Sequence, residues 1–474
     1  MTVTMLIAIS PQLIIAFGIC MQLLFIAGRR SQAMIQCLTM AIITLAIVAN
    51  INLWSIDPIS VTPLVKVDSY GVFAFILVAI SSFTVALLSR QYLSRYTEVH
   101  DEYYVLLLLA TLGASILVNS AHFASLFLGF ELLSISLVGL VGYMREQRFA
   151  VETSFKYLIL SASASSFMLL GIALIYSQTG SLSFEFHQVS TYIPKLFHLI
   201  GVLLFLVGVI LKLSLVPFHF WTPDVYQGAP LPITLLLATV SKVAMFTVLL
   251  KCWLSQQYYI HEQLLALIAA IAMLSMLVGN VLALKQQNIK RLLGYSSIAH
   301  MGYLLIVLII YGQQSIELVW QTSLFYLAAY VLANLSIFTV LVVLSSKSIA
   351  EDDIVIADLH GLFWQSPMLA SLIILAILSL AGIPLTMGFI GKFYLLSYAT
   401  QAQLWGLISV LIVSSGIGLF YYLKVIFALF KTTDDKDAFV HIYPIQRILT
   451  IVFVIAGLIL GVFPDFIGNL IITL

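Results

Sequence analysis

The chain has 474 residues, of which 62% are hydrophobic and 9% are charged, and its formal net charge is +1. Soluble globular domains carry about 25% charged residues, so this composition excludes an ordinary water-soluble domain and makes the lipid bilayer the main solvent of the surface. A net charge this small also lacks the basic excess of a nucleic-acid-binding protein.

Long apolar runs predict an all-α integral membrane protein with about 14 transmembrane helices, since a helix needs about 20 mostly apolar residues to cross the hydrocarbon core. The runs are continuous rather than alternating, which favours helices over a β-barrel. In chain order the predicted spans are 6–27, 33–54, 70–89, 104–120, 122–142, 154–177, 197–218, 232–253, 264–284, 293–311, 320–345, 368–398, 403–429 and 447–472.

These spans fall into four predicted segments, two of which have matching layouts. Each of the two contains five spans, and the fourth span of each is interrupted by a proline, Pro217 or Pro384. An odd number of spans inverts the second copy, so we predict two inverted five-helix repeats with broken helices 7 and 12. The segments are an N-terminal three-helix segment at 1–103, repeats at 104–253 and 264–429, and a C-terminal helix within 430–474.

Lysine and arginine placement predicts the orientation, because connections rich in these residues stay in the cytoplasm. The connections of the poorer side hold only Lys66, Lys195 and Lys251. With an even number of spans, both termini are predicted to be periplasmic, and no cleaved signal peptide is expected. The richer side holds Arg29, Arg30, Arg90, Arg95, Arg145, Arg148, Lys285, Lys290, Arg291, Lys347, Lys431 and Lys436.

Four charged residues lie deep inside predicted spans. They are Glu131, Lys212, Lys242 and Lys392. A charge at this depth costs roughly 2.5–3.5 kcal/mol on insertion scales, and four unpaired charges facing lipid would cost on the order of 10 kcal/mol. We therefore expect all four side chains to face the interior of the helix bundle.

Two interpretations of these charges stay open. In the first, Glu131 and Lys212 form a static salt bridge that holds helices together. In the second, the residues form a proton relay, because burial disfavours a charged lysine, a nearby carboxylate favours it, and a lysine under both influences can load and release a proton. His300 extends the relay, since Ser296, Ser297, His300 and Tyr303 lie on one polar helix face.

Several segments resemble one known family. HFASLFLGFELLSISLVGLVGY, KYLILSASASSFMLLG, KLSLVPFHFWTPDVYQGAP, NIKRLLGYSSIAHMGYLL and LAGIPLTMGFIGKFY resemble the antiporter-like membrane subunits of the proton-pumping NADH–quinone oxidoreductase, complex I. The YQGAP ending, the length and the lack of a long lateral helix are most similar to the subunit N type. The sister subunit M type is expected to carry a glutamate at the position of Lys392.

The resemblance implies a role for each buried charge. Glu131 would modulate Lys212, Lys242 would be the central relay group with His300 as a continuation, and Lys392 would lead to the exit. The chain would be one subunit of a translocase in the bacterial inner (plasma) membrane, beside subunit M and small membrane subunits. NADH, FMN, iron–sulfur clusters and quinone would bind partner subunits, which fits the lack of nucleotide and cysteine motifs here, so this chain is expected to hold no cofactor or metal.

Two alternative functions differ in whether they need these buried charges. A subunit of a cation/proton antiporter would use the same lysine and glutamate machinery. A structural membrane spacer would gain nothing from buried charges that cost this much, so the interior lysines count against it.

Overall fold

The computed structural model describes residues 3–28, 31–54, 57–94, 101–145, 147, 149–185, 195–311, 314–345, 353–432 and 444–465. Half of the basic residues on the predicted cytoplasmic side lie outside these ranges, as do both chain ends. Those residues are Arg29, Arg30, Arg95, Arg148, Lys347 and Lys436.

Helices make up most of the described chain, in agreement with the predicted fold class. Within the described ranges, 13 helices are long and apolar enough to cross a membrane. Twelve are single helices: α2 (Ser10–Ala27), α3 (Gln32–Ile51), α4 (Ser69–Leu93), α5 (Asp101–Val118), α6 (Phe123–Val141), α7 (Ala150–Thr179), α8 (Lys195–Leu213), α12 (Glu262–Leu284), α13 (Ile289–Ile310), α14 (Ile316–Leu344), α18 (Trp405–Phe430) and α19 (Pro444–Val462). The thirteenth joins α10 (Leu231–Ala238) to α11 (Val240–Ser255).

The twelfth predicted span, 368–398, is divided between two shorter helices. They are α16 (Pro367–Ala381) and α17 (Met387–Gln401), and in the turn between them Gly382 and Leu385 have positive φ. The predicted span 197–218 extends too far, because α8 ends at Leu213 and Ser214 has a φ of 64°. The chain therefore leaves the helix before it reaches Pro217. The inverted relation of the two segments stays a prediction.

Short elements complete the fold. A two-stranded antiparallel hairpin that the sequence did not predict joins β1 (Ile59–Thr62) to β2 (Val65–Val67). The remaining short helices are α1 (Val3–Ala8), α9 (Trp221–Gly228) and α15 (Leu362–Gln365), with 3₁₀ turns at Tyr258–Ile260 and Ile356–Leu359.

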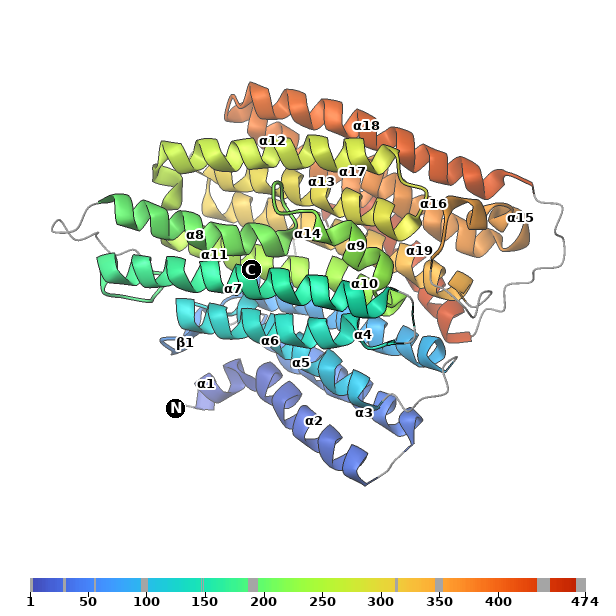
Figure 1. Cartoon of the computed structure of the whole chain (residues 1–474), viewed down its shortest axis with the longest axis horizontal. Helices are drawn as coiled ribbons and strands as arrows, with labels where there is room; N and C mark the ends of the chain where they lie inside the picture. Colours follow the sequence, from blue (N-terminus) through green and yellow to red (C-terminus); the bar gives the residue numbers. More distant parts are fainter. Residues whose placement is uncertain are drawn as a thin grey trace.

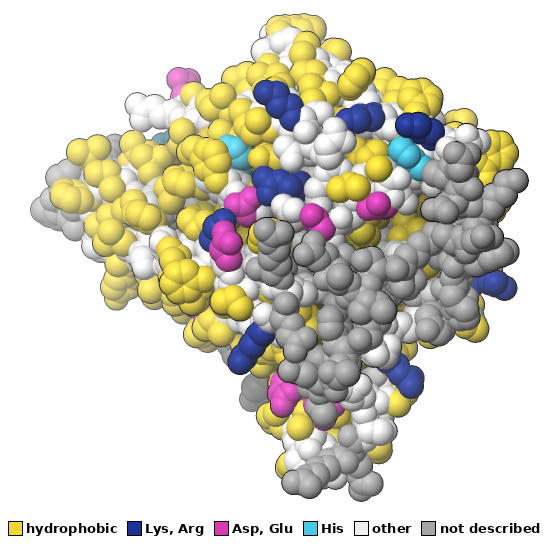
Figure 2. Space-filling model, turned by 45° about the vertical axis from the view of Figure 1, so that its right-hand side comes forward, with side chains coloured by type: hydrophobic (Ala, Val, Ile, Leu, Met, Phe, Trp, Pro, Cys, Tyr) yellow, Lys and Arg dark blue, Asp and Glu magenta, His cyan; other side chains and the backbone are white. Residues whose placement is uncertain are grey.

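The long helices lie side by side along one direction, so the bundle has two end faces (Figure 1). We call the end with the β1–β2 hairpin the hairpin face; there α4 begins and α11 ends. The opposite end is the basic face, where Arg90, Arg145, Lys285, Arg291 and Lys431 lie. Figure 2 shows charged side chains gathered at this end, with hydrophobic side chains around them, as expected for a bundle that crosses a bilayer.

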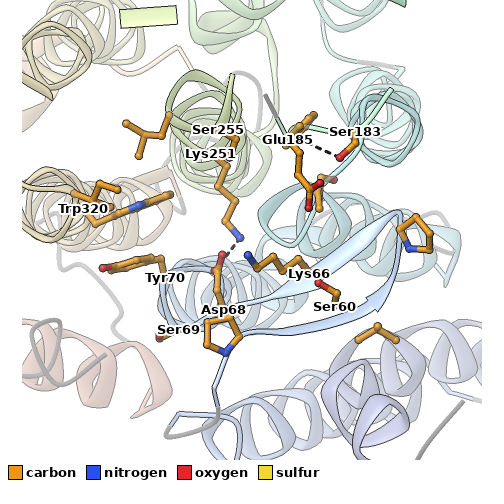
Figure 3. A pocket seen from close by; sticks show the side chains of 18 of the residues that line it. Ser60, Lys66, Asp68, Ser69, Tyr70, Ser183, Glu185, Lys251, Ser255 and Trp320 are labelled. Carbon is orange, nitrogen blue, oxygen red and sulfur yellow. Dashed lines mark hydrogen bonds and ion pairs between the residues drawn. The ribbon is translucent and has the colours of Figure 1, made fainter. Parts of the chain in front are cut away.

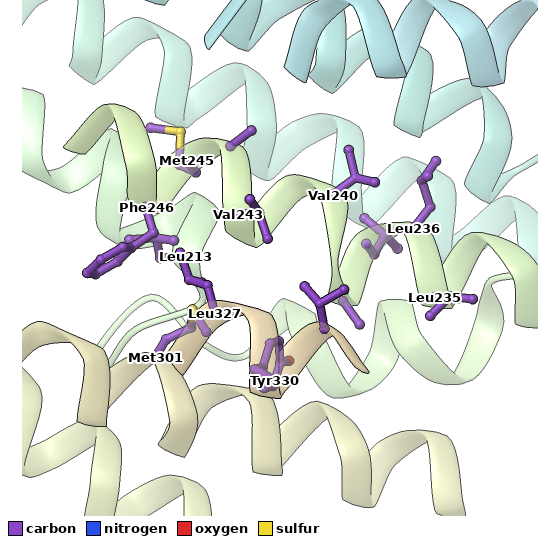
Figure 4. Close-up of a cluster of buried hydrophobic side chains, with 14 of the residues drawn as sticks. Leu213, Leu235, Leu236, Val240, Val243, Met245, Phe246, Met301, Leu327 and Tyr330 are labelled. Carbon is purple, nitrogen blue, oxygen red and sulfur yellow. The ribbon is translucent and has the colours of Figure 1, made fainter. Parts of the chain in front are cut away.

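Burial distinguishes helices at the centre of the bundle from helices on its outside. Over an 18-residue stretch of each span, every residue of α10–α11 and 94% of the residues of α13 and α14 are buried within the chain, against 28% in α2 and 22% in α19. Apolar side chains fill the space where α11 packs near α13 and α14, among them Val243, Phe246, Met301 and Leu327 (Figure 4). The helix that carries Lys242 is thus surrounded by protein on every side.

Candidate functional site

Lys212 lies in the last turn of α8 and is bound by two neighbouring helices. Its side chain is 1% exposed. Its Nζ donates to the Ser134 hydroxyl of α6 at 2.9 Å and to the Tyr157 hydroxyl of α7 at 2.5 Å. The same Nζ lies 5.3 Å from the centre of the Phe130 ring, so aromatic faces complete the surroundings of the charge.

Glu131 lies on α6, one turn before Ser134 and on the same side of the helix. It is half-buried, and its Oε1 accepts a hydrogen bond from the Ser165 hydroxyl of α7. Among the ion pairs of the described residues, none joins Glu131 to Lys212. The carboxylate therefore stands near the lysine without binding it directly, which is not the geometry of the static salt bridge.

Lys242 reaches from α11 to the end of α8. Its Nζ donates to the backbone carbonyl of Lys212 at 3.3 Å and to the Ser214 hydroxyl at 2.5 Å. The last carbonyls of a helix have no partner within the helix and carry a partial negative charge, so an ammonium group is stabilised there. The side chain is fully buried, and its charge acts directly on the end of the helix that carries Lys212.

Lys392 makes the equivalent contact in the second half of the chain. Its Nζ, on α17, donates to the carbonyls of Leu380 at 3.0 Å and Ala381 at 2.9 Å, at the end of α16. Gly382 ends that helix with a φ of 79°, a conformation that glycine adopts without steric cost. Lys392 itself is half-buried.

His300 lies at the centre of a network of hydroxyl groups. Its Nδ1 is 2.7 Å from the Tyr326 hydroxyl of α14, and its Nε2 is 3.3 Å from the Tyr422 hydroxyl of α18. The Tyr422 hydroxyl also bonds to Ser296, one turn before His300. A cavity of about 10 Å³, lined by His300 and Leu380 among others, has room for about one water molecule between this network and the end of α16.

The predicted site residues thus come together as two groups. We call Glu131, Ser134, Tyr157, Lys212 and Lys242 the first polar cluster. His300, Tyr326, Tyr422 and Lys392 form the second polar cluster. The apolar side chains of Figure 4 lie between α11, which carries Lys242, and the helices of the second cluster.

Sequence reasoning missed the hydroxyl partners and the burial of two lysines. Ser134, Tyr157, Tyr326 and Tyr422 carry a weak sequence signal, since serine and tyrosine also pack between membrane helices. Lys290, predicted to lie in a connection, is fully buried on α13 and donates to the Ala229 carbonyl at 3.0 Å. Lys251, also predicted for a connection, is a buried residue of α11.

Comparison with known proteins agrees with this architecture. The family described as NADH:quinone oxidoreductase/Mrp antiporter, transmembrane, matches residues 120–418. A chain of respiratory complex I from Thermus thermophilus with bound aureothin is 30% identical, with a TM-score of 0.84, and the match covers 97% of this chain and 98% of that chain.

Two more distant structures share the fold. A chain of the membrane-bound sulfane sulfur reductase, an archaeal respiratory membrane complex, is 22% identical with a TM-score of 0.85, covering 99% of this chain and 96% of that chain. A chain of the Mrp complex from Dietzia sp. DQ12-45-1b is 17% identical with a TM-score of 0.86, covering 100% of this chain and 97% of that chain. The all-α membrane fold is confirmed.

Proposed function

Because the chain belongs to the NADH:quinone oxidoreductase/Mrp antiporter transmembrane family, we propose that it is a proton-translocating subunit of a complex I-type NADH–quinone oxidoreductase. Electron transfer from NADH to quinone takes place in other subunits and drives proton movement through this one. The subunit N type is the finer assignment that the sequence motifs favour.

One observation carries this proposal: the fully buried Lys242 donates to the carbonyl of Lys212 and to Ser214. A neutral lysine at this point loses its charge-assisted bonds to the helix end, and a charged one regains them. Proton occupancy at Lys242 is therefore coupled to the backbone beside Lys212. Glu131, Lys212, Lys242, His300 and Lys392 are the proposed relay residues.

The surroundings of the subunit follow from the same proposal. The partners are the subunit M type and small membrane subunits, and NADH, FMN, iron–sulfur clusters and quinone bind elsewhere in the complex. The membrane is the bacterial inner membrane, with the basic face in the cytoplasm and both termini in the periplasm. Residues 104–253 and 264–429 are the proposed inverted repeats.

The test replaces Lys242 by Arg and by Ala in the intact complex. Arginine keeps the charge and the donors but does not release its proton, so Lys242→Arg should abolish NADH-driven proton pumping in inverted membrane vesicles while the complex still assembles. Lys285→Ala, an exposed lysine on the basic face, is the control. Normal pumping in both Lys242 variants would refute the relay.

A cation/proton antiporter subunit is the second candidate, because the matching family includes Mrp antiporters. Co-purification separates the two candidates. If the chain purifies with NADH dehydrogenase activity, the respiratory function stands. If it purifies without that activity and vesicles show sodium-dependent proton efflux instead, the antiporter function replaces it.

A further inference from the structure

A cavity of about 970 Å³ opens on the hairpin face, away from both polar clusters (Figure 3). Its lining includes Lys66, Asp68 and Tyr70 near the start of α4, Lys251 of α11, and Trp320 of α14. The Tyr70 and Trp320 rings stack at 4.7 Å and close one side. The cavity therefore lies where the N-terminal segment, 1–103, meets the segments 104–253 and 264–429.

An ion pair forms one wall of this cavity. Lys251 Nζ lies 2.8 Å from Asp68 Oδ1, and the two side chains are only 8% and 18% exposed. Asp68 also accepts the backbone N–H of Gly71 at 2.7 Å and so caps α4. Among the ion pairs of the described residues, this one is the most buried.

The side chain of Asn119 lies beside the Asp68–Lys251 ion pair. A Cβ atom on Gly71 would lie 2.6 Å from Asn119 Oδ1, 3.0 Å from Asp68 Oδ1 and 3.1 Å from Lys251 Nζ, so only glycine leaves these atoms room. Asn119 is 2% exposed, and its Oδ1 accepts no hydrogen bond from the described chain. Buried polar atoms of this kind are usually satisfied by ordered water.

The cavity lies at the ends of the helices that carry the relay. Lys251 follows Lys242 on α11, and Tyr311 at the cavity edge directly follows α13, the helix of His300. One turn from Lys251 on the same side of α11, the buried Thr247 hydroxyl also has no hydrogen-bond partner among the described residues. Polar atoms that can hold water thus continue from the cavity into the bundle.

We propose that this cavity is the aqueous vestibule of the proton path on the hairpin face, with the Asp68–Lys251 pair as its gate. A proton from the buried relay passes to the Asp68 carboxylate, and the neutral carboxyl no longer holds Lys251. The carboxyl then gives the proton to water in the vestibule and the pair re-forms. Lys66 and Glu185 are the other charged residues that line the cavity, and Tyr70 and Tyr311 are its tyrosines. The inference rests on the proposed function.

The first test is Asp68→Asn in the intact complex. Asparagine is as good an N-cap as aspartate, so α4 keeps its cap while the gate loses its charge. NADH-driven pumping should fall roughly fivefold. The matched control is Asp57→Asn, an exposed carboxylate in the same connection, which should pump normally.

The second test leaves the gate intact and probes the cavity. In a chain with Cys20, Cys37 and Cys252 replaced by Ala, Ser255→Cys places a thiol at the cavity, and Asp57→Cys places one on the same face outside the cavity lining. A membrane-impermeant maleimide added from the hairpin side should label both positions. Pumping, compared before and after labelling of each preparation, should fall only with the Ser255→Cys adduct.

The outcomes separate this inference from the proposed function. If Ser255→Cys does not react, or if its adduct and Asp68→Asn both leave pumping unchanged while Lys242→Arg abolishes it, the vestibule is refuted and the relay stands. If Lys242→Arg and Lys242→Ala both pump normally, the proposed function fails, and the vestibule as a proton exit fails with it.

Discussion

The two polar clusters use the same electrostatic contact in different surroundings. In each, a lysine ammonium donates to the last carbonyls of an interrupted helix, α8 or α16. Lys242 reaches α8 from a separate span and is fully buried, whereas Lys392 sits on the direct continuation of α16 and is half-buried. The Lys242 contact therefore joins two separate spans, α11 and α8. The Lys392 contact joins the two halves of one divided span, α17 and α16.

The groups around the two contacts differ as well. The first cluster holds a carboxylate, Glu131, and a second lysine, Lys212, while the second holds His300 and two tyrosines. Charges interact strongly in a buried, low-dielectric setting, so moving one proton changes the energy of its neighbours more in the first cluster than in the second. We expect substitutions in the first cluster to have the larger effects.

The largest expected effect comes from Lys212→Met, compared with Lys392→Met. Removing Lys212 should lower NADH-driven pumping about tenfold or more, and removing Lys392 about threefold, because a positioned proton carrier contributes most where no other group can replace it. Dye quenching in inverted vesicles, normalised to assembled complex, measures both. Equal losses of pumping would mean that the lysines of the two clusters contribute equally to proton transport.

Glu131→Gln should have the next largest effect. Glutamine keeps an oxygen that can accept from Ser165 but lacks the charge, so pumping should fall about fivefold while the complex assembles normally. The control is Ser165→Ala, which removes the hydrogen bond and keeps the carboxylate. If Glu131→Gln lowers the amount of complex and leaves the pumping per complex unchanged, the static salt bridge is the better interpretation.

A smaller effect is expected from Tyr422→Phe in the second cluster. The change deletes the hydroxyl that contacts both His300 and Ser296, so pumping should fall about twofold. Tyr398→Phe is the control, because this half-buried tyrosine of α17 lies outside the cluster. Equal effects of the two changes would show that His300 does not depend on Tyr422.

The smallest expected effect on transport, with a measurable effect on stability, comes from Gly461→Ala in α19. A Cβ atom there would lie 2.4 Å from the Leu385 carbonyl in the α16–α17 turn, and such overpacking costs about 1–3 kcal/mol. The thermal midpoint of the purified complex should fall by a few degrees. Gly457→Ala is the control, since nothing lies within 4 Å of its added Cβ.

The sequence predicted the helical membrane fold and the location of the buried charges well, for a physical reason. Long apolar runs and the cost of a charge in lipid are local properties, so Lys212 and Lys242 were predicted to lie inside the bundle, and both are buried. The place where α8 ends was predicted less well, because Ser214 leaves the helix through a left-handed conformation that serine rarely adopts.

The partners of each charge could not be predicted from the sequence. The bond of Lys242 to the carbonyl of Lys212 joins residues that are 30 positions apart, and the Asp68–Lys251 pair joins residues that are 183 apart. Both depend on how whole helices pack. No periodicity within one helix carries that information.

The enclosure of α11 has a consequence for how this protein is made. Residues 231–253 are all buried in the finished bundle, yet much of what surrounds them, including α13 and α14, is translated later. During synthesis, a span with a central lysine therefore enters the membrane before its later neighbours exist. A lysine that faces lipid at this depth costs roughly 2.5–3.5 kcal/mol on insertion scales, and the apolar residues of the span must offset this cost until the later helices arrive. Biogenesis therefore constrains this sequence as well as transport does.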